Sequence, residues 1–213
     1  ARLTAAHPKH KLRFRNVAWE GDTVYEQWRD VNFGKWAQQL AYLKADVVFV
    51  QFGQMEALDG KVRIPEFTAA YEKLLDEFEK QTKRIVLMSP TAFGAPEAKS
   101  APPLYNRNND LQAYVKAIKG IAAKRGLVFV DLFLPKGSTD SKQALLRGDG
   151  IHLNEGGHFV TAIYTKDQLG YRDIDLHPID DSLLDEILEK NRLWQNYWRP
   201  MNYAFAFGDR THV

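Results

Sequence analysis

Short apolar runs rich in β-branched and aromatic residues recur along the chain and predict four strands. They cover Leu12–Trp19, Asp46–Phe52, Arg84–Ser89 and Leu127–Phe133. The second and fourth runs, VVFVQF and LVFVDLF, show almost no alternation with polar residues, which is typical of strands buried on both faces. The pattern therefore indicates a sheet that is covered on both sides.

Between the strands, apolar residues recur at the spacing of one helix face. One face follows Pro65 and another ends before Gly126. The first face consists of Phe67, Ala70, Tyr71, Leu74, Leu75 and Phe78. The second face consists of Leu111, Tyr114, Val115, Ile118 and Ile121. Strands that alternate with helices predict parallel pairing, right-handed crossovers and a three-layer α/β/α sandwich with a flavodoxin-like sheet.

Residues 1–178 are expected to form one α/β domain. The last part, residues 179–213, reads as a helix that begins near Ile179 and runs into an aromatic tail packed on that domain. The loops Gly94–Asn108 and Pro135–Gly150 follow strands at the carboxyl edge of the sheet. Ligands of open parallel sheets bind at that edge, so these loops are predicted to frame the functional site.

Composition excludes several classes of function. The 213 residues are 45% hydrophobic, and 29 basic residues nearly balance 27 acidic ones without gathering in a patch for nucleic acid. No apolar run reaches the roughly 20 residues that cross a bilayer. The absence of cysteine excludes disulfides and thiolate chemistry, and no metal or cofactor motif is present. We therefore expect a soluble globular unit with no nucleic-acid partner, membrane insertion or cofactor.

The segment Gly148-Asp149-Gly150-Ile151-His152 carries the clearest chemistry. It places a carboxylate three residues before an imidazole in a glycine-containing loop, with a helix beginning near Asn154. Asp149 can accept the Nδ1 proton of His152 and leave Nε2 free as a general base, which is two thirds of a catalytic triad. Alternatively, Asp149 caps the following helix and His152 is a packing residue.

In this loop and two earlier blocks the chain resembles the SGNH (GDSL-type) hydrolases. Their final block is D-x-x-H, matched by Asp149 and His152 and followed by a helix like Glu155–Lys166. A glycine after their second strand is matched by Gly21, and their G-x-N-D block lines up with Gly53-Gln54-Met55-Glu56. The resemblance implies that Asp149 and His152 are catalytic and that the Gly21 N–H is an oxyanion-hole donor.

Two departures from that family pattern affect the prediction. The family's oxyanion asparagine falls on Met55, whose thioether donates no hydrogen bond, and Gln54 is the neighbouring amide that could substitute for it. The family's Gly-Asp-Ser nucleophile block belongs upstream of Leu12–Trp19, and no serine here follows Gly-Asp. We therefore expect that the sequence is a fragment of a longer chain, although the aromatic tail could instead fill the resulting gap in the sheet.

Residues near the expected carboxyl edge are candidates for the substrate pocket. They are Trp19, Glu20, Asp22, Gly53 and Glu56. The three acids among them could bind a metal or a sugar hydroxyl, but acids without a ligand pattern more often form a solvated rim. The serine Ser89 ends a strand, but its Met88-Ser89-Pro90 setting lacks a sharp nucleophile turn and argues against a catalytic role.

The resemblance implies a serine ester hydrolase that deacylates a carbohydrate or another small ester, with its nucleophile outside this sequence. It also favours SGNH domains of large exported bacterial proteins, an exported or periplasmic location, and further domains in a longer chain. The alternative function is a noncatalytic, glycan-binding SGNH-like module, which Met55 at the oxyanion position favours. A nucleotide-binding role is disfavoured because no glycine-rich phosphate loop follows any strand.

Overall fold

The computed structural model describes residues 3–4, 7–19, 21–27, 35–133, 145–172 and 181–198. The chain divides into two compact units. The described residues 21–27, 35–133 and 145–172 belong to one unit, which holds the sheet, and residues 3–4, 7–19 and 181–198 belong to the other. Each unit is described by itself.

The larger unit contains a three-stranded parallel sheet in the order β1-β2-β3. The strands are β1 (Val48–Gln51), β2 (Ile85–Met88) and β3 (Val128–Val130). Val48 lies opposite Ile85, and Val86 lies opposite Val128, so each strand is in register with the next one along the chain. Three of the four predicted strands are confirmed, each shorter than the apolar run that predicted it.

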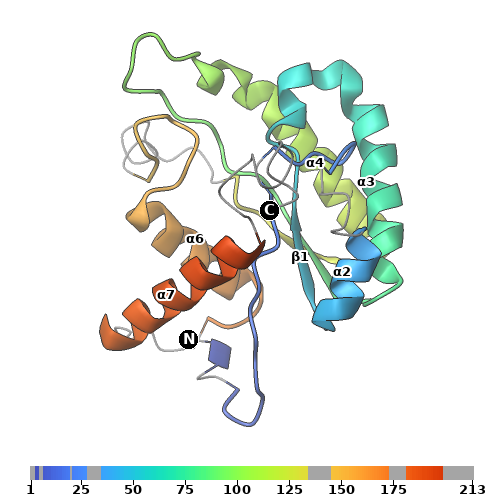
Figure 1. Cartoon of the computed structure of the whole chain (residues 1–213). Helices are drawn as coiled ribbons and strands as arrows, with labels where there is room; N and C mark the ends of the chain where they lie inside the picture. The colour runs from blue at the N-terminus through green and yellow to red at the C-terminus, as the bar shows by residue number, and fades with distance from the viewer. Residues whose placement is uncertain are drawn as a thin grey trace, which may run out of the picture. The chain divides into compact units, whose positions relative to one another are not determined.

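Helices precede, connect and follow these strands and flank the sheet on both sides. They are α2 (Trp36–Leu43), α3 (Ile64–Glu79), α4 (Asn108–Arg125) and α6 (Glu155–Gln168), with short 3-10 turns η1 (Glu56–Asp59), η2 (Lys61–Arg63) and η3 (Leu104–Arg107). Figure 1 shows α3 and α4 on one side of the strands and α6 on the other. The predicted three-layer α/β/α sandwich is confirmed.

The predicted apolar faces of α3 and α4 form the main core. Phe67, Tyr71 and Leu75 of α3 meet Leu111 and Tyr114 of α4, and all five are fully buried. The Phe67 ring contacts those of Tyr71 and Tyr114 edge to face. Pro65 lies in the first turn of α3, as expected. Gly126 ends α4 in the left-handed conformation, where a glycine is favoured.

The other face of the sheet has a smaller core, and α6 is joined to it by its C-terminal end. Val86 and Val130 are buried there against Leu169, the residue after α6. The Gln168 side chain accepts the Asp131 N–H at 2.8 Å and donates to the Asp131 carbonyl at 2.9 Å. These paired bonds tie α6 to the carboxyl end of β3.

The prediction of a strand at Leu12–Trp19 is wrong. These residues belong to the smaller unit and form no strand. A strand needs a neighbouring strand to receive its N–H groups. Here the Leu12 N–H donates to the nearby His10 carbonyl at 3.1 Å, and the Ala18 N–H donates to the Asn16 side chain at 3.0 Å.

The smaller unit also contains α7 (Asp181–Trp198), which confirms the helix expected in the C-terminal part. The Trp194 indole N–H donates to the Asn16 carbonyl at 2.6 Å, and the Arg15 guanidinium lies 4.8 Å from the centre of the Trp194 ring. Most of the aromatic tail that follows α7 lies outside the described residues. None of the helices in the described part of the chain combines the length and the apolar character that a membrane crossing requires.

Ser89 has a structural role at the carboxyl ends of β2 and β3. Its side chain is fully buried, and its Oγ accepts the N–H groups of Leu132 at 2.7 Å and Phe133 at 2.8 Å. The same hydroxyl lies 3.1 Å from a carboxylate oxygen of Asp131. Ser89 therefore joins the carboxyl ends of β2 and β3 by hydrogen bonds. This structural role agrees with the prediction that Ser89 is not the nucleophile.

We predict that Ser89→Ala lowers the free energy of unfolding by about 1–3 kcal/mol, because the buried Leu132 N–H loses its acceptor and the Phe133 N–H keeps only its bond to the Asp131 carboxylate. Urea denaturation followed by circular dichroism measures this change. The matched control Ser100→Ala removes an exposed hydroxyl and should change stability by less than about 0.5 kcal/mol. Equal stability of the two variants would contradict the structural role of Ser89.

Candidate active site

A tight loop at residues 145–154 brings Asp149 and His152 together. The Arg147 N–H donates to the His152 carbonyl at 2.7 Å, and the Gly150 N–H donates back to the Arg147 carbonyl at 2.9 Å. Gly150 adopts a φ of +71°, in the left-handed region that favours glycine. The glycines that the sequence places around Asp149 therefore allow the chain to reverse within a few residues.

Asp149 and His152 form a hydrogen-bonded pair within this loop. The His152 Nδ1 lies 2.7 Å from Asp149 Oδ2. The other carboxylate oxygen, Oδ1, accepts the N–H groups of Ile151 at 2.8 Å and His152 at 2.9 Å. These bonds, led by the two from the backbone, lower the pKa of Asp149 to about 2. Asp149 is therefore ionised at neutral pH.

The ionised state of Asp149 determines which nitrogen of His152 carries the proton. A carboxylate can only accept a hydrogen bond, so the neutral imidazole has its proton on Nδ1 and its lone pair on Nε2. The His152 side chain is 61% exposed and that of Asp149 is 41% exposed. A substrate can therefore approach an oriented imidazole with a basic Nε2, which is the arrangement required of a general base.

The alternative in which Asp149 caps the helix and His152 is a packing residue is wrong. Asn154 caps α6, because its Oδ1 accepts the Gly157 N–H at 2.9 Å. The Asn154 amide also donates to the Leu146 carbonyl at 3.0 Å and anchors the loop to the start of the helix. With the cap supplied by Asn154, Asp149 is available to bind His152.

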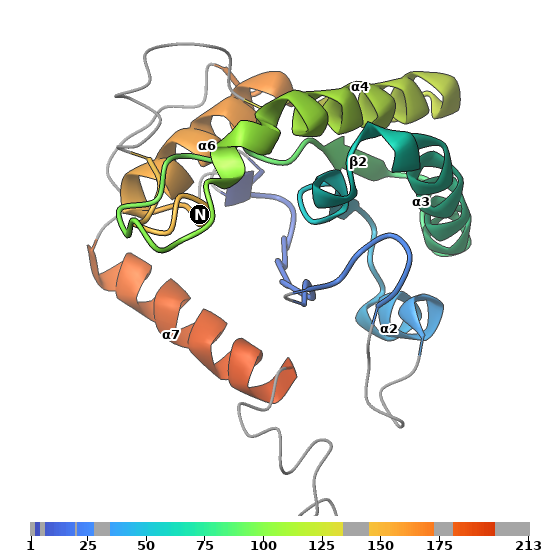
Figure 2. The same ribbon diagram turned by 90° about the horizontal axis from the view of Figure 1, so that it is seen from above.

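The loop that follows β2 holds the Asp149–His152 loop in place. The Gly94 N–H donates to the Gly150 carbonyl at 2.8 Å, and the Glu97 N–H donates to the Gly148 carbonyl at 2.8 Å. Figure 2 shows these two segments, coloured green and orange, running side by side. The loop beginning at Gly94 therefore contacts the Asp149–His152 loop, and its role in framing a functional site stays a prediction, as does that of the second loop, whose residues 135–144 lie outside the described residues.

The loop after β2 is also held by hydrogen bonds to the Asn108 side chain and contacts the Gly53 block. Phe93 exchanges two hydrogen bonds with the Asn108 side chain, each 2.9 Å long. The Gln54 amide donates to the Thr91 carbonyl at 3.2 Å. The loop after β2 therefore contacts both the Gly53 block and the Asp149–His152 loop.

The Gly53-Gln54-Met55-Glu56 block forms a turn directly after β1. Gly53 is buried with a φ of +110°, and a Cβ at this position would lie 3.1 Å from Ile118. Gln54 is half-buried, and one of its two amide hydrogens remains after the bond to Thr91. Met55, at the family's asparagine position, is 53% exposed.

The expectation of a solvated rim is wrong for Glu56. This residue is 2% exposed, and its two carboxylate oxygens accept the N–H groups of Val24 and Gly53, each at 2.8 Å. Burial raises the pKa of Glu56, while these backbone hydrogen bonds oppose that rise. Periodicity could not identify this role because Val24 is distant in sequence. The one sequence feature that indicates a buried role for Glu56 is the presence of an acid among the apolar residues of η1.

The remaining predicted pocket residues lie in different parts of the chain. Gly21 is exposed in a turn with a φ of +83°, and Asp22 beside it is half-buried. Trp19 is half-buried in the smaller unit, and Glu20 lies outside the described residues. The roles assigned to these residues, to Gly53 and to Gln54 stay predictions, whereas the predicted pocket role of Glu56 is wrong because its carboxylate is buried and bound to backbone N–H groups. Among the described residues, no group of three or more His, Asp or Glu side chains is arranged to hold a metal ion.

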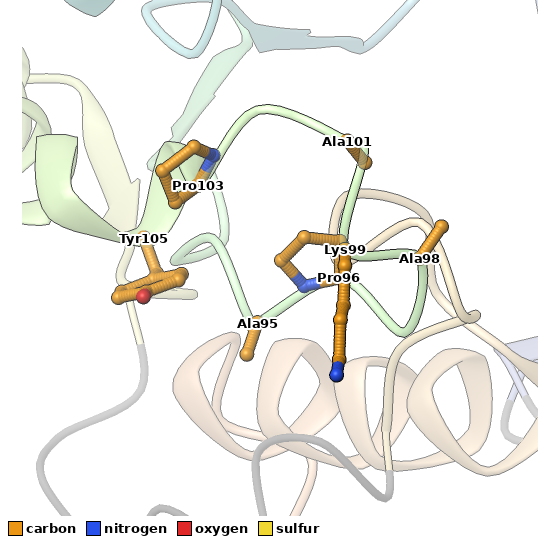
Figure 3. Close-up of a pocket in the computed structure, with 7 residues that line it drawn as sticks. All are labelled: Ala95, Pro96, Ala98, Lys99, Ala101, Pro103 and Tyr105. Atoms are coloured by element: carbon orange, nitrogen blue, oxygen red, sulfur yellow. The ribbon is translucent and has the colours of Figure 1, made fainter.

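A hollow of about 220 Å³ lies within the loop after β2, next to the segment that contacts Gly148 and Gly150. Ala95, Pro96, Ala98, Lys99, Ala101, Pro103 and Tyr105 line it (Figure 3). Most of the lining residues are alanine or proline, and Lys99 and Tyr105 are the larger ones. The hollow is part of the loop that frames the Asp149–His152 pair.

Comparison with known proteins identifies the family. The model of the GDSL-like lipase/acylhydrolase family matches residues 1–159. The chain belongs to this family. None of the curated proteins matches the chain.

Two solved structures share the fold of this GDSL-like chain. LAE5, an alpha/beta hydrolase enzyme from the metagenome of Lake Arreo, is 24% identical, with a TM-score of 0.58 over 80% of this chain and 78% of its own. A variant of Axe2, an acetyl xylan esterase from Geobacillus stearothermophilus, is 21% identical, with a TM-score of 0.58 over 81% and 79%. Another Axe2 variant aligns over 66% of its own length.

We predict that the side chain of Asp149 titrates with a pKa of about 2, below its ordinary value of 3.8. Because the pKa is depressed in the folded state, the stabilisation is present above about pH 4 and is lost as the pH falls toward 2. NMR titration of the Asp149 carboxyl carbon measures this pKa directly. In His152→Ala the pKa should rise only in part, because both backbone N–H donors remain. A wild-type value of 3.8 would contradict the geometry of the pair.

Proposed function

We propose that this chain is the acid–base part of a serine ester hydrolase that deacylates a carbohydrate or another small ester. The observation that carries the proposal is the exposed Asp149–His152 pair, with its 2.7 Å bond to Nδ1 and a carboxylate of depressed pKa. Membership of the GDSL-like lipase/acylhydrolase family supports the same reaction class.

In the proposed reaction, a serine from a segment outside these 213 residues attacks the ester carbonyl. His152 Nε2 takes the serine proton and passes it to the leaving alcohol, and Asp149 stabilises the imidazolium that forms. Water then enters, gives a proton to His152, attacks the acyl-enzyme and releases the acid. The serine proton is restored from His152 in that last step.

Charge that develops on the carbonyl oxygen needs hydrogen-bond donors. The Gly21 N–H is the proposed backbone donor, and the second amide hydrogen of Gln54 is the proposed side-chain donor. Met55 cannot supply this hydrogen bond. The bond from Gln54 to Thr91 supports the role of Gln54, because it restricts the direction of the amide.

We predict that His152→Ala lowers kcat by about 10²-fold to 10⁴-fold on a small acetyl ester, because the general base is lost. The assay uses a protein that carries the proposed serine segment together with these residues, with 4-nitrophenyl acetate as the first substrate. The matched control is His158→Ala, which removes an exposed histidine of α6 outside the pair. Unchanged turnover in His152→Ala would rule out the proposed mechanism.

A second candidate function is a noncatalytic, glycan-binding module. The exposed Met55 at the family's oxyanion position favours it, because the expected side-chain donor is absent there. This function predicts saturable binding of oligosaccharides by calorimetry without release of acyl groups. Acetylated xylo-oligosaccharides are a suitable probe, since one structural relative is named as an acetyl xylan esterase. Hydrolysis of the probe by the protein that carries the proposed serine segment would favour the enzyme.

A further inference from the structure

Glu56 is an unusual residue in the core. Among the described residues, the buried polar side chains are those of Glu56 and Ser89, and only Glu56 carries an ionisable carboxylate. Removing a carboxylate from water is costly unless hydrogen bonds compensate for the lost hydration. The retention of an acid at this position therefore needs an explanation beyond packing.

The two hydrogen bonds of Glu56 join segments that are far apart in sequence. Oε1 accepts the N–H of Val24, 32 residues away, and Oε2 accepts the N–H of Gly53, three residues away. Both bonds are 2.8 Å long, within the range of strong hydrogen bonds to a charged acceptor. A single rigid carboxylate therefore sets the separation of two backbone turns.

These two turns carry the proposed oxyanion donors. Val24 follows Gly21 by three residues, and Gly53 directly precedes Gln54. A hydrogen-bond donor stabilises an oxyanion only when it lies about 2.7–3.1 Å from the oxygen. The distance between the two proposed donors therefore affects the rate of the proposed ester hydrolysis. The carboxylate contacts backbone atoms, and its own burial keeps it from touching the substrate.

We propose that Glu56 is a positioning residue, which fixes the turn at Gly21–Val24 against the turn at Gly53–Gln54 and so holds the oxyanion donors at their working separation. This inference rests on the proposed ester hydrolysis. It assigns a role to an acid for which the Asp149–His152 mechanism has no direct use.

The variant Glu56→Gln tests the inference with little change in side-chain size. A glutamine side chain keeps one oxygen acceptor and replaces the other with an NH₂ group, which cannot accept an N–H bond. One of the two turns therefore loses its anchor. The matched control is Asp59→Asn, which removes an exposed charge from the same 3-10 turn, η1.

The first measurement is amide hydrogen exchange by NMR, which needs no enzymatic activity. In the wild-type protein, the Val24 and Gly53 amides should be protected. In Glu56→Gln, at least one of them should exchange about 10-fold faster or more, while both keep wild-type rates in Asp59→Asn. Unprotected wild-type amides, or unchanged exchange in Glu56→Gln, would overturn the inference whether or not the protein hydrolyses esters.

The second measurement separates positioning from simple stability. In a protein that carries the proposed serine segment, assayed well below its unfolding midpoint, Glu56→Gln should lower kcat on 4-nitrophenyl acetate by about 10-fold or more and change KM by less than about 3-fold. Wild-type kcat in a folded Glu56→Gln protein would overturn the inference. Absence of turnover in the wild type would instead contradict the proposed function and leave the exchange result to decide the role of Glu56.

Glu56→Asp provides a second variant in case Glu56→Gln does not fold. Its carboxylate keeps the charge but is shorter by one methylene, so it cannot reach both N–H groups at 2.8 Å. Exchange at Val24 or Gly53 should again be faster than in the wild type, and kcat should again fall. Full wild-type behaviour of Glu56→Asp in both measurements would overturn the inference.

Discussion

The site depends on a close contact between two backbone segments, at Gly94 and Gly150. The Gly94 N–H donates to the Gly150 carbonyl at 2.8 Å, and a Cβ on Gly150 would lie 2.5 Å from the Gly94 carbonyl oxygen. Only a residue without a side chain allows this approach. The contact joins the Asp149–His152 loop to the segment that leaves β2. The position of the exposed imidazole therefore depends on backbone hydrogen bonds between the two loops.

Two carboxylates near these loops have opposite electrostatic environments and different roles. Asp149 is exposed, and hydrogen bonds lower its pKa to about 2, so it remains an anion that can stabilise an imidazolium. Glu56 is buried, and desolvation raises its pKa even though two N–H groups oppose the shift. In the proposed mechanism the first carboxylate acts on the imidazole of His152, whereas the second holds two backbone turns. A difference in environment therefore gives the same functional group two separate uses.

Local patterns in the sequence predict those parts of the structure that are determined locally. The faces of α3 and α4 follow from helical periodicity, and the Asp149–His152 pair follows from a three-residue spacing with glycines that permit a tight turn. The strand at Leu12–Trp19 was predicted wrongly because an apolar pattern does not supply a hydrogen-bond partner, and Leu12 and Phe14 are themselves exposed.

The role of Glu56 was missed for a related reason. Its partner Val24 is 32 residues away, and no short motif encodes that contact. The roles of Asn108 and Ser89 likewise depend on bonds between segments that meet only in the folded chain. Residues that join loops are therefore harder to predict from one sequence than residues that react, because reactive groups recur in compact patterns.

The open edge of β1 bears on the proposed source of the nucleophile. In the described sheet β1 pairs only with β2, yet its sequence is that of a buried strand, and Phe49 is 45% exposed. An additional parallel strand beside β1 would satisfy its free backbone groups and would end at the same edge of the sheet as Gly53. A serine at the end of such a strand would lie at the edge where the loops of Gly53 and His152 gather. One such segment would thus meet both the chemical need of the triad and the physical need of the sheet.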